Sequence, residues 1–154
     1  AYLRFGRPSW PIFTAPDRPF TIGKADKMIE GTDVTIFACG HLVWHAIEAE
    51  AKLAEKGISA EVINIHTIKP LDVEAILASV EKTRCVVTAE EHQINGGLGD
   101  SVAQVLARFR PAPIEMVAVN DSFGESGTPT QLLKKYGLSP ENIVAAAEKV
   151  LKRK

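Results

Sequence analysis

The chain has 154 residues, 45% of them hydrophobic and 24% charged, with a formal net charge of −1. This length suits one compact domain that buries about 70% of its unfolded surface, without the support of disulfides or metals. The near-neutral net charge gives no electrostatic reason to expect binding to nucleic acid or to an anionic membrane surface. No apolar run approaches the roughly 18 residues of a membrane span.

The N-terminal part of the chain is expected to be a connection. Residues 1–7 alternate as a strand does, and residues 8–22 carry four prolines, which exclude a helix or a central strand. We predict that residues 1–7 end a preceding domain and that residues 8–22 form an extended linker. Residues 23–154 would then be the domain proper.

Strand-like and helix-like segments alternate through the rest of the chain. Strands are predicted at an edge segment, 24–30, and at 34–39, 60–65, 85–89 and 114–119. Helices are predicted to begin near Leu42, Asp72, Asp100, Thr128 and Ser139. This alternation predicts a three-layer α/β/α fold with a mostly parallel five-stranded sheet and one antiparallel edge strand.

The segment TAEEHQINGGLGDS, residues 88–101, is the most informative part of the sequence. An apolar strand ends there in Glu90 and Glu91, His92 follows, and three glycines precede the next helix. Ligands of open parallel sheets bind beyond the carboxyl ends of the strands, which makes Glu91 and His92 candidates for a functional loop. A structural, hydrogen-bonded histidine is favoured over a catalytic base at His92.

The glycine turn invites a comparison with nucleotide-binding loops. The segment from Gly97 lacks the third glycine of the dinucleotide fingerprint and follows the third strand rather than the first. Three nearby carboxylates, Glu90, Glu91 and Asp100, would repel a phosphate. We therefore interpret the glycines as allowing a tight turn and a close approach of the helix.

Two other patterns are weaker. His41 and His45 lie four residues apart, but position 42 is Leu where a zinc protease has glutamate, so a metal site is disfavoured. Cys39 and Cys85 belong to apolar segments, which favours buried, reduced thiols of a cytoplasmic protein. The chain begins at Ala1 rather than at methionine, so we expect a processed product or a fragment.

Taken together, these segments resemble the C-terminal part of transketolase, most closely the C-terminal section of transketolases encoded as two subunits. The marks are the R-x-x-R-P entry from Arg4 to Pro8 and the segments FACG, INIHTIKPLD, VVTAEEHQINGGLGDSVA, DSFGESG and LLKKYGLSPENIV. Related candidates are deoxyxylulose phosphate synthase and the β subunit of 2-oxoacid dehydrogenases. A free-standing regulatory module that uses the Glu91 and His92 strand end is the alternative of a different class.

The resemblance implies what the complete enzyme does. It would transfer a two-carbon ketol unit between sugar phosphates in the pentose phosphate pathway, as a homodimer with thiamine diphosphate and Mg²⁺ held by the preceding domains. Residues 1–7 would end the pyrimidine-binding domain, and this chain alone would bind no cofactor or metal, have no catalytic residue and be inactive. Arg7 matches the family's arginine for the sugar phosphate, whereas Gly6 stands where other members often have Ser.

Overall fold

Strands and helices alternate in the computed structural model, which describes residues 9–154. The strands are β1 (Asp26–Ile29), β2 (Val34–Ala38), β3 (Ala60–Asn64), β4 (Val86–Gln93) and β5 (Ile114–Val119). The helices are α1 (Leu42–Ala54), α2 (Val73–Thr83), α3 (Leu98–Phe109), α4 (Pro129–Lys135) and α5 (Pro140–Leu151). The predicted strand at residues 1–7 lies outside the described residues.

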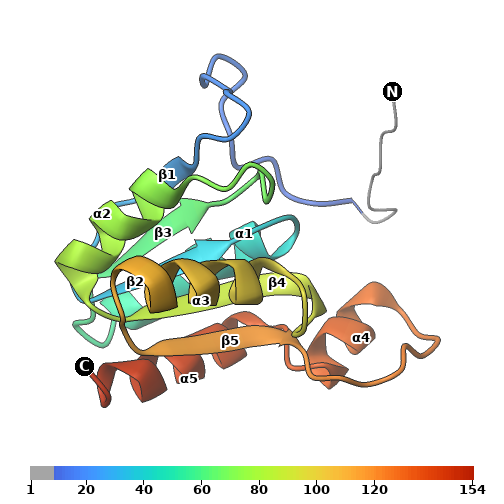
Figure 1. Cartoon of the computed structure of the whole chain (residues 1–154). Helices are drawn as coiled ribbons and strands as arrows, with labels where there is room; N and C mark the ends of the chain where they lie inside the picture. The colour runs from blue at the N-terminus through green and yellow to red at the C-terminus, as the bar shows by residue number, and fades with distance from the viewer. Residues whose placement is uncertain (1–8) are drawn as a thin grey trace.

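The five strands form one sheet in the order β1-β3-β2-β4-β5. Neighbouring strands run parallel except at the β1 edge, where β1 pairs with β3 antiparallel. Helices α1 and α5 cover one face of the sheet and α2 and α3 cover the other, while α4 lies beyond the end of β5 (Figure 1). The predicted three-layer fold with one antiparallel edge strand is confirmed.

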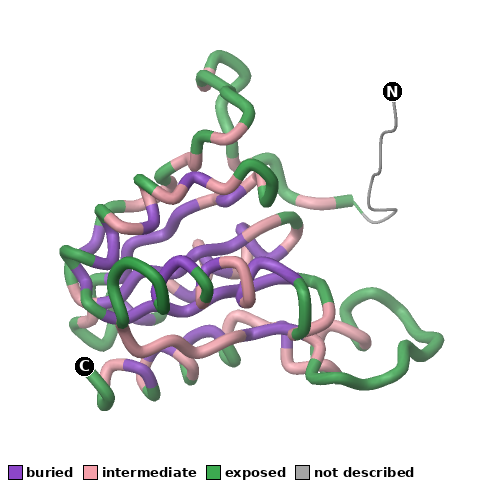
Figure 2. The backbone as a smooth tube through the Cα atoms, viewed as in Figure 1, coloured by how far each residue is buried: buried purple, intermediate pink, exposed green. Residues whose placement is uncertain are grey.

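The central strand β2 shows why the sheet is covered on both faces. All five of its residues are buried. Val34, Ile36 and Ala38 pack into the cluster formed with α1 and α5, whereas Phe37 packs into the cluster formed with α2 and α3. Successive side chains of a strand point to opposite faces, so a continuous apolar run serves both layers. Figure 2 shows the buried backbone concentrated in the strands and on the inner sides of the helices.

Three helices begin at the residues that the sequence predicted, and side chains cap their first turns. The Asp72 carboxylate accepts the backbone N–H of Ala75 at 3.2 Å and caps α2. Capping boxes start α4 at Thr128 and α5 at Ser139, each followed by proline in the first turn. These contacts fix the residues at which the three helices begin.

Strand β4 is longer than predicted. It continues from Val86 to Gln93, so Glu90, Glu91 and His92 belong to the strand rather than to a loop after it. Its pairing with β5 is irregular after Ala89 and resumes at Gln93. The strand therefore projects charged side chains beyond the apolar part of the sheet, at the edge where the carboxyl ends of the parallel strands meet.

Smaller differences concern the neighbouring segments. Residues 9–25 contain only turns and bends, and β1 is limited to Asp26–Ile29 within the predicted segment 24–30. Helix α3 begins at Leu98, two residues earlier than predicted. Phe109 is the last residue of α3 and is 53% exposed.

Candidate functional site

The carboxyl edge of the sheet brings together residues from the segment before β1, from β4 and from the start of α1. His41 Nδ1 lies 2.8 Å from Glu91 Oε2, joining the N-cap of α1 to the end of β4. The indole of Trp10 stacks on the His41 ring, with centroids 4.6 Å apart, and its Nε1–H donates to the His41 carbonyl at 3.2 Å. Three segments far apart in sequence thus meet at one histidine.

His45 extends this group along α1. Its ring lies 5.4 Å from the ring of Trp10, and its Nδ1 donates to the Leu138 carbonyl at 2.8 Å. The two histidines that lie four residues apart therefore have different partners, Glu91 for His41 and a backbone carbonyl for His45. Within residues 9–154 there is no group of three or more His, Cys, Asp or Glu placed to hold a metal ion.

The structure separates the two candidate residues of the strand end. The Glu91 carboxylate binds His41, whereas His92 is exposed and its Nδ1 donates to the neighbouring Gln93 carbonyl at 2.8 Å. Adjacent residues of a strand point to opposite sides, which explains the separation. Arg7, the candidate phosphate-binding residue, lies outside the described residues.

Glu90 has a role that the sequence did not reveal. Its side chain is 3% exposed and accepts the backbone N–H groups of Leu98 at 2.7 Å and of Gly99 at 2.8 Å. These amides belong to the first turn of α3, where the helix dipole favours negative charge. A carboxylate of the protein thus fills the position at which a helix N-terminus would bind a phosphate, which fits the interpretation of the glycines as a tight turn.

The charge of Glu90 also affects a cysteine at the same edge. Burial, together with the nearby Glu90 carboxylate, raises the pKa of the Cys39 thiol to about 12. Burial likewise raises the pKa of the Cys85 thiol. Both cysteines are free, and a thiol with a raised pKa is a poor nucleophile.

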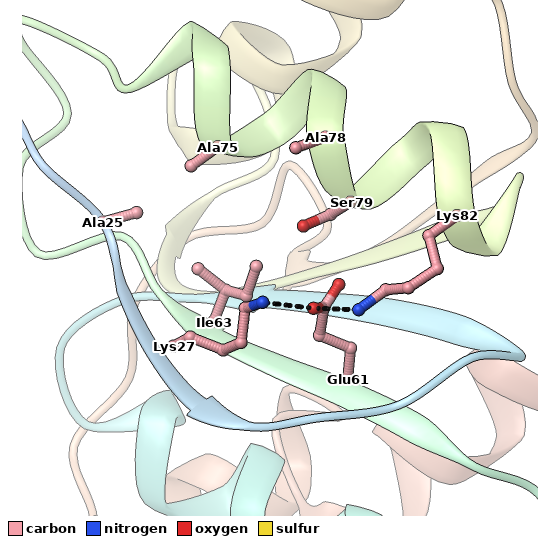
Figure 3. Close-up of a pocket in the computed structure, with 8 residues that line it drawn as sticks. All are labelled: Ala25, Lys27, Glu61, Ile63, Ala75, Ala78, Ser79 and Lys82. Atoms are coloured by element: carbon pink, nitrogen blue, oxygen red, sulfur yellow. Dashed lines mark hydrogen bonds and ion pairs between the residues drawn. The ribbon is translucent and has the colours of Figure 1, made fainter.

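A second charged group lies between α2 and the β1–β3 edge, around a cavity of about 280 Å³. Figure 3 shows Glu61 between Lys27 and Lys82, with the small side chains of α2 above them. The Glu61 carboxylate is fully buried, with Lys82 Nζ at 2.6 Å, Lys27 Nζ at 3.4 Å and the Thr35 hydroxyl at 3.0 Å. A charged residue inside the apolar strand AEVIN was the sequence signal for this group.

The lysines of this second group also contact Glu30 outside the cavity, so each ammonium lies between two carboxylates. Burial opposes the charge of Lys82, but the hydrogen bonds and charges of Glu61 and Glu30 together raise its pKa above the ordinary value. Because these charges are satisfied by one another, we interpret this group as structural support for the sheet edge.

Two layers of helices around a mostly parallel sheet define a three-layer α/β domain, in which the Glu90 carboxylate at the end of β4 binds the amides that follow the glycine turn. Residues 23–143 match the family model described as transketolase, C-terminal domain, and the chain belongs to this family. The matched range includes β1 to β5 and helices α1 to α4. Every helix within residues 9–154 is too short or too polar to span a bilayer.

Two named relatives extend this family assignment. The chain is 47% identical, over 99% of its length, to the 6-deoxy-6-sulfo-D-fructose transketolase subunit SqwH of Clostridium sp. (strain MSTE9) and covers 48% of that protein. It is 39% identical, again over 99% of its length, to a subunit of the apulose-4-phosphate transketolase of Phocaeicola vulgatus and covers 49% of it. The chain thus spans about half the length of the curated relatives it matches.

A solved structure agrees with the fold in detail. A split-gene transketolase, described as an inactive β4 tetramer, superimposes with a TM-score of 0.92 at 45% sequence identity. The match covers 95% of this chain and 48% of that one. The chain is therefore similar to one half of a subunit of transketolases whose enzyme is divided between two polypeptides.

Proposed function

We propose that the chain is the C-terminal section of a split transketolase, whose complete form transfers a two-carbon ketol unit between sugar phosphates. The observation that carries this proposal is the 47% identity to a named transketolase subunit across nearly the whole chain. The two named relatives act on different sugars, so we propose the class of substrate rather than one sugar.

In this proposal the carbon chemistry takes place outside the chain. Thiamine diphosphate with Mg²⁺ supplies that chemistry when bound by the preceding domains. Residues 9–154 do not fit the diphosphate at their glycine turn, because the Glu90 carboxylate occupies the amides of Leu98 and Gly99. The chain would support the assembly, and Arg7 would hold the sugar phosphate through a bidentate contact that positions the remote reacting carbon.

The partners follow from the part of the relatives that the chain spans. The chain covers only about half of each named relative, so we propose that a pyrimidine-binding domain precedes it and ends with residues 1–7. We also propose a separate N-terminal subunit that binds the cofactor. Two copies of the complete enzyme, each made of the N-terminal subunit and the C-terminal section, would form a homodimer. The solved split-gene relative, an inactive tetramer of β chains, supports the further proposal that this chain is inactive alone. Free thiols at Cys39 and Cys85 support a cytoplasmic location.

Isolation of the native complex tests this proposal. The chain is captured with its partners, the masses of the complex are measured, and ketol transfer from a ketose phosphate to an aldose phosphate is assayed with thiamine diphosphate and Mg²⁺. We expect transfer by the complex, and neither transfer nor calorimetric cofactor binding by the chain alone. Tight cofactor binding by the chain alone would contradict the proposal.

The same preparation distinguishes the alternatives. A section of deoxyxylulose phosphate synthase would condense pyruvate with glyceraldehyde phosphate, and a 2-oxoacid dehydrogenase section would oxidise a 2-oxoacid. A free-standing module would be recovered without a cofactor-binding partner. Each of these outcomes replaces the transketolase proposal with the corresponding alternative.

A further inference from the structure

The loop between β5 and α4 presents an aromatic side chain to solvent. Residues 120–128, which we call the Phe123 loop, are all exposed, and Phe123 itself is 96% exposed. The loop lies beyond the end of β5, beside α4 (Figure 1). A phenylalanine buries about 150–250 Å² when it is covered, and such aromatic residues are the usual anchors of protein–protein contacts. The loop therefore offers an anchor that nothing in its own chain covers.

The backbone around Phe123 is held in place by side chains of the fold. Tyr136 Oη, just after α4, donates to the Phe123 carbonyl at 2.9 Å. Gln93 Nε2, at the end of β4, donates to the Ser122 carbonyl at 2.9 Å. Because the loop is already tied to the fold at these two points, covering Phe123 with a partner costs less conformational entropy than ordering a free loop.

Helix α4, which follows this loop directly, forms one wall of an open groove of about 680 Å³ that we call the α4 groove. Its lining is largely apolar and includes the rings of Trp10 and His45 and the side chains of Leu133 and Pro140. The Phe123 ring of the same chain does not fill it, because that ring is exposed to solvent. Aromatic rings attract one another in edge-to-face arrangements, so a groove walled by an indole and an imidazole suits a phenyl ring.

The loop and the groove also carry charges of opposite sign. Lys134 lines the α4 groove, and Asp121 lies two residues before Phe123. The neighbouring residues Lys135 and Glu125 pair with each other at 2.6 Å, whereas Lys134 and Asp121 form no ion pair in the described part of the chain. A loop that enters the groove of another copy would thus bring an anion to a cation.

We propose that the Phe123 loop of one copy of this chain docks in the α4 groove of a second copy. The Phe123 ring then lies against Trp10 and Leu133. Asp121 approaches Lys134. Because each copy carries both the loop and the groove, the contact is made twice around a two-fold axis and forms an isologous dimer.

This dimer contact assigns a surface and is a property of the C-terminal domain itself. It goes beyond the proposed function, since it can fail while ketol transfer by the complete enzyme stands, and it can hold if that function is wrong. Two loops in two grooves make a small interface, below the about 1,200 Å² of stable complexes. We therefore expect a weak dimer whose population depends on concentration.

Sedimentation velocity of the 154-residue chain tests the proposal directly. Between about 1 and 500 μM we expect a monomer–dimer equilibrium. Phe123→Ser should raise Kd at least about tenfold, as loss of a central aromatic anchor does. A chain that stays monomeric over the whole range would overturn the proposal, and so would a dimer whose Kd does not change in Phe123→Ser.

A second exposed phenylalanine provides the matched control. Phe109 is 53% exposed and ends α3, away from the Phe123 loop and the α4 groove. Phe109→Ser removes a similar apolar ring and should leave Kd unchanged. An equal loss in Phe109→Ser and Phe123→Ser would show general apolar association in place of a defined contact.

Charge reversal tests the reciprocal geometry. Asp121→Lys and Lys134→Glu should each weaken the dimer about threefold or more, because each places like charges together at both contacts. Mixing the two variants should restore association: one contact of the mixed dimer joins the two reversed charges, and the other keeps the original pair. A mixture that associates no better than either variant alone would overturn the pairing of the loop with the groove.

The assembled complex distinguishes a second copy from another occupant of the groove. If Phe123→Ser leaves self-association intact but releases the cofactor-binding subunit in a pull-down, the loop docks on that subunit and the proposal is wrong. The ketol-transfer assay of the wild-type complex decides the proposed function separately.

Discussion

Glu90 and Gly97 are matched in shape: a Cβ built on Gly97 would lie 2.1 Å from Glu90 Oε2. The backbone of Gly97, with φ of −101°, is one that any residue can adopt, so space rather than conformation demands glycine there. The missing Cβ lets the carboxylate reach the first amides of α3. The most recognisable motif of the chain therefore serves to join β4 to α3.

Replacement of Gly97 should be costly for stability. In Gly97→Ala the new methyl group displaces the buried carboxylate from the amides of Leu98 and Gly99. We expect the free energy of unfolding to fall by about 1–3 kcal/mol, the usual cost of overpacking a filled site. Urea unfolding followed by circular dichroism measures this change.

A second glycine provides the control. A Cβ on Gly124 meets no atom within 4 Å, so Gly124→Ala should change the free energy of unfolding by less than about 0.5 kcal/mol. A loss in Gly97→Ala no larger than in Gly124→Ala would contradict the matched arrangement.

The buried Glu61 makes a different prediction. Lys82→Met removes the ammonium that lies 2.6 Å from a fully buried carboxylate and leaves Lys27 at 3.4 Å. A buried charge that loses a partner is strongly destabilising, so we expect a loss of about 2–3 kcal/mol, moderated by the partial exposure of Lys82.

Thermal and urea unfolding of Lys56→Met provide the comparison for Lys82→Met. Lys56 forms an ion pair with Glu148 at 2.6 Å, with both side chains at least 40% exposed. Removing this pair should cost far less than Lys82→Met, because solvent screens exposed charges. Equal effects of the two substitutions would show that the Glu61 group does not support the sheet edge.

The sequence predicted the fold because its signals are local and agree with one another. Apolar runs indicated the strands, and Asp72, Thr128 and Ser139 indicated where helices begin, as the structure shows. The alternation of these elements then predicted a parallel sheet. The end of β4 was predicted wrongly, because charged residues were taken to mark a loop. The strand instead resumes its pairing with β5 at Gln93, and the charge of Glu90 is satisfied by helix amides.

The candidate site was less accessible to sequence reasoning. Glu91 was selected for its place at a strand end, yet its partner His41 lies 50 residues earlier in the chain. The stacking of Trp10 on His41 depends on the path of residues 9–25, which have no regular secondary structure. Contacts of this kind arise from tertiary packing and leave no periodic signal.

Cysteine reactivity offers a test of the electrostatics at the same edge. With a pKa raised to about 12, the Cys39 thiol is ionised to about one part in ten thousand at pH 8. We expect slow alkylation by iodoacetamide in the folded chain and fast alkylation in urea, followed by mass spectrometry. Cys85→Ser isolates Cys39, and native labelling as fast as in urea would contradict the raised pKa.

Glu141 makes stability depend on pH in a defined window. The hydrogen bond from Lys52, then those of the Glu141 backbone and Ser139, lower the pKa of its carboxyl to about 2 from its ordinary value of 4.5. A carboxyl whose pKa is lower in the folded state stabilises fully above the unfolded pKa and loses that contribution as pH falls through the folded pKa. The contribution of Glu141 is therefore present above about pH 4.5 and fades toward pH 2.

Urea unfolding of the wild type and Glu141→Gln at several pH values measures this dependence. The wild type should be the more stable at pH 7, by less than about 1 kcal/mol because both partners of the ion pair are exposed, and the two should converge near pH 2. Lys52→Met should reduce the pH dependence, since the Lys52 hydrogen bond is the largest cause of the shift. A difference that persists unchanged at pH 2 would show that Glu141 stabilises α5 through packing rather than charge.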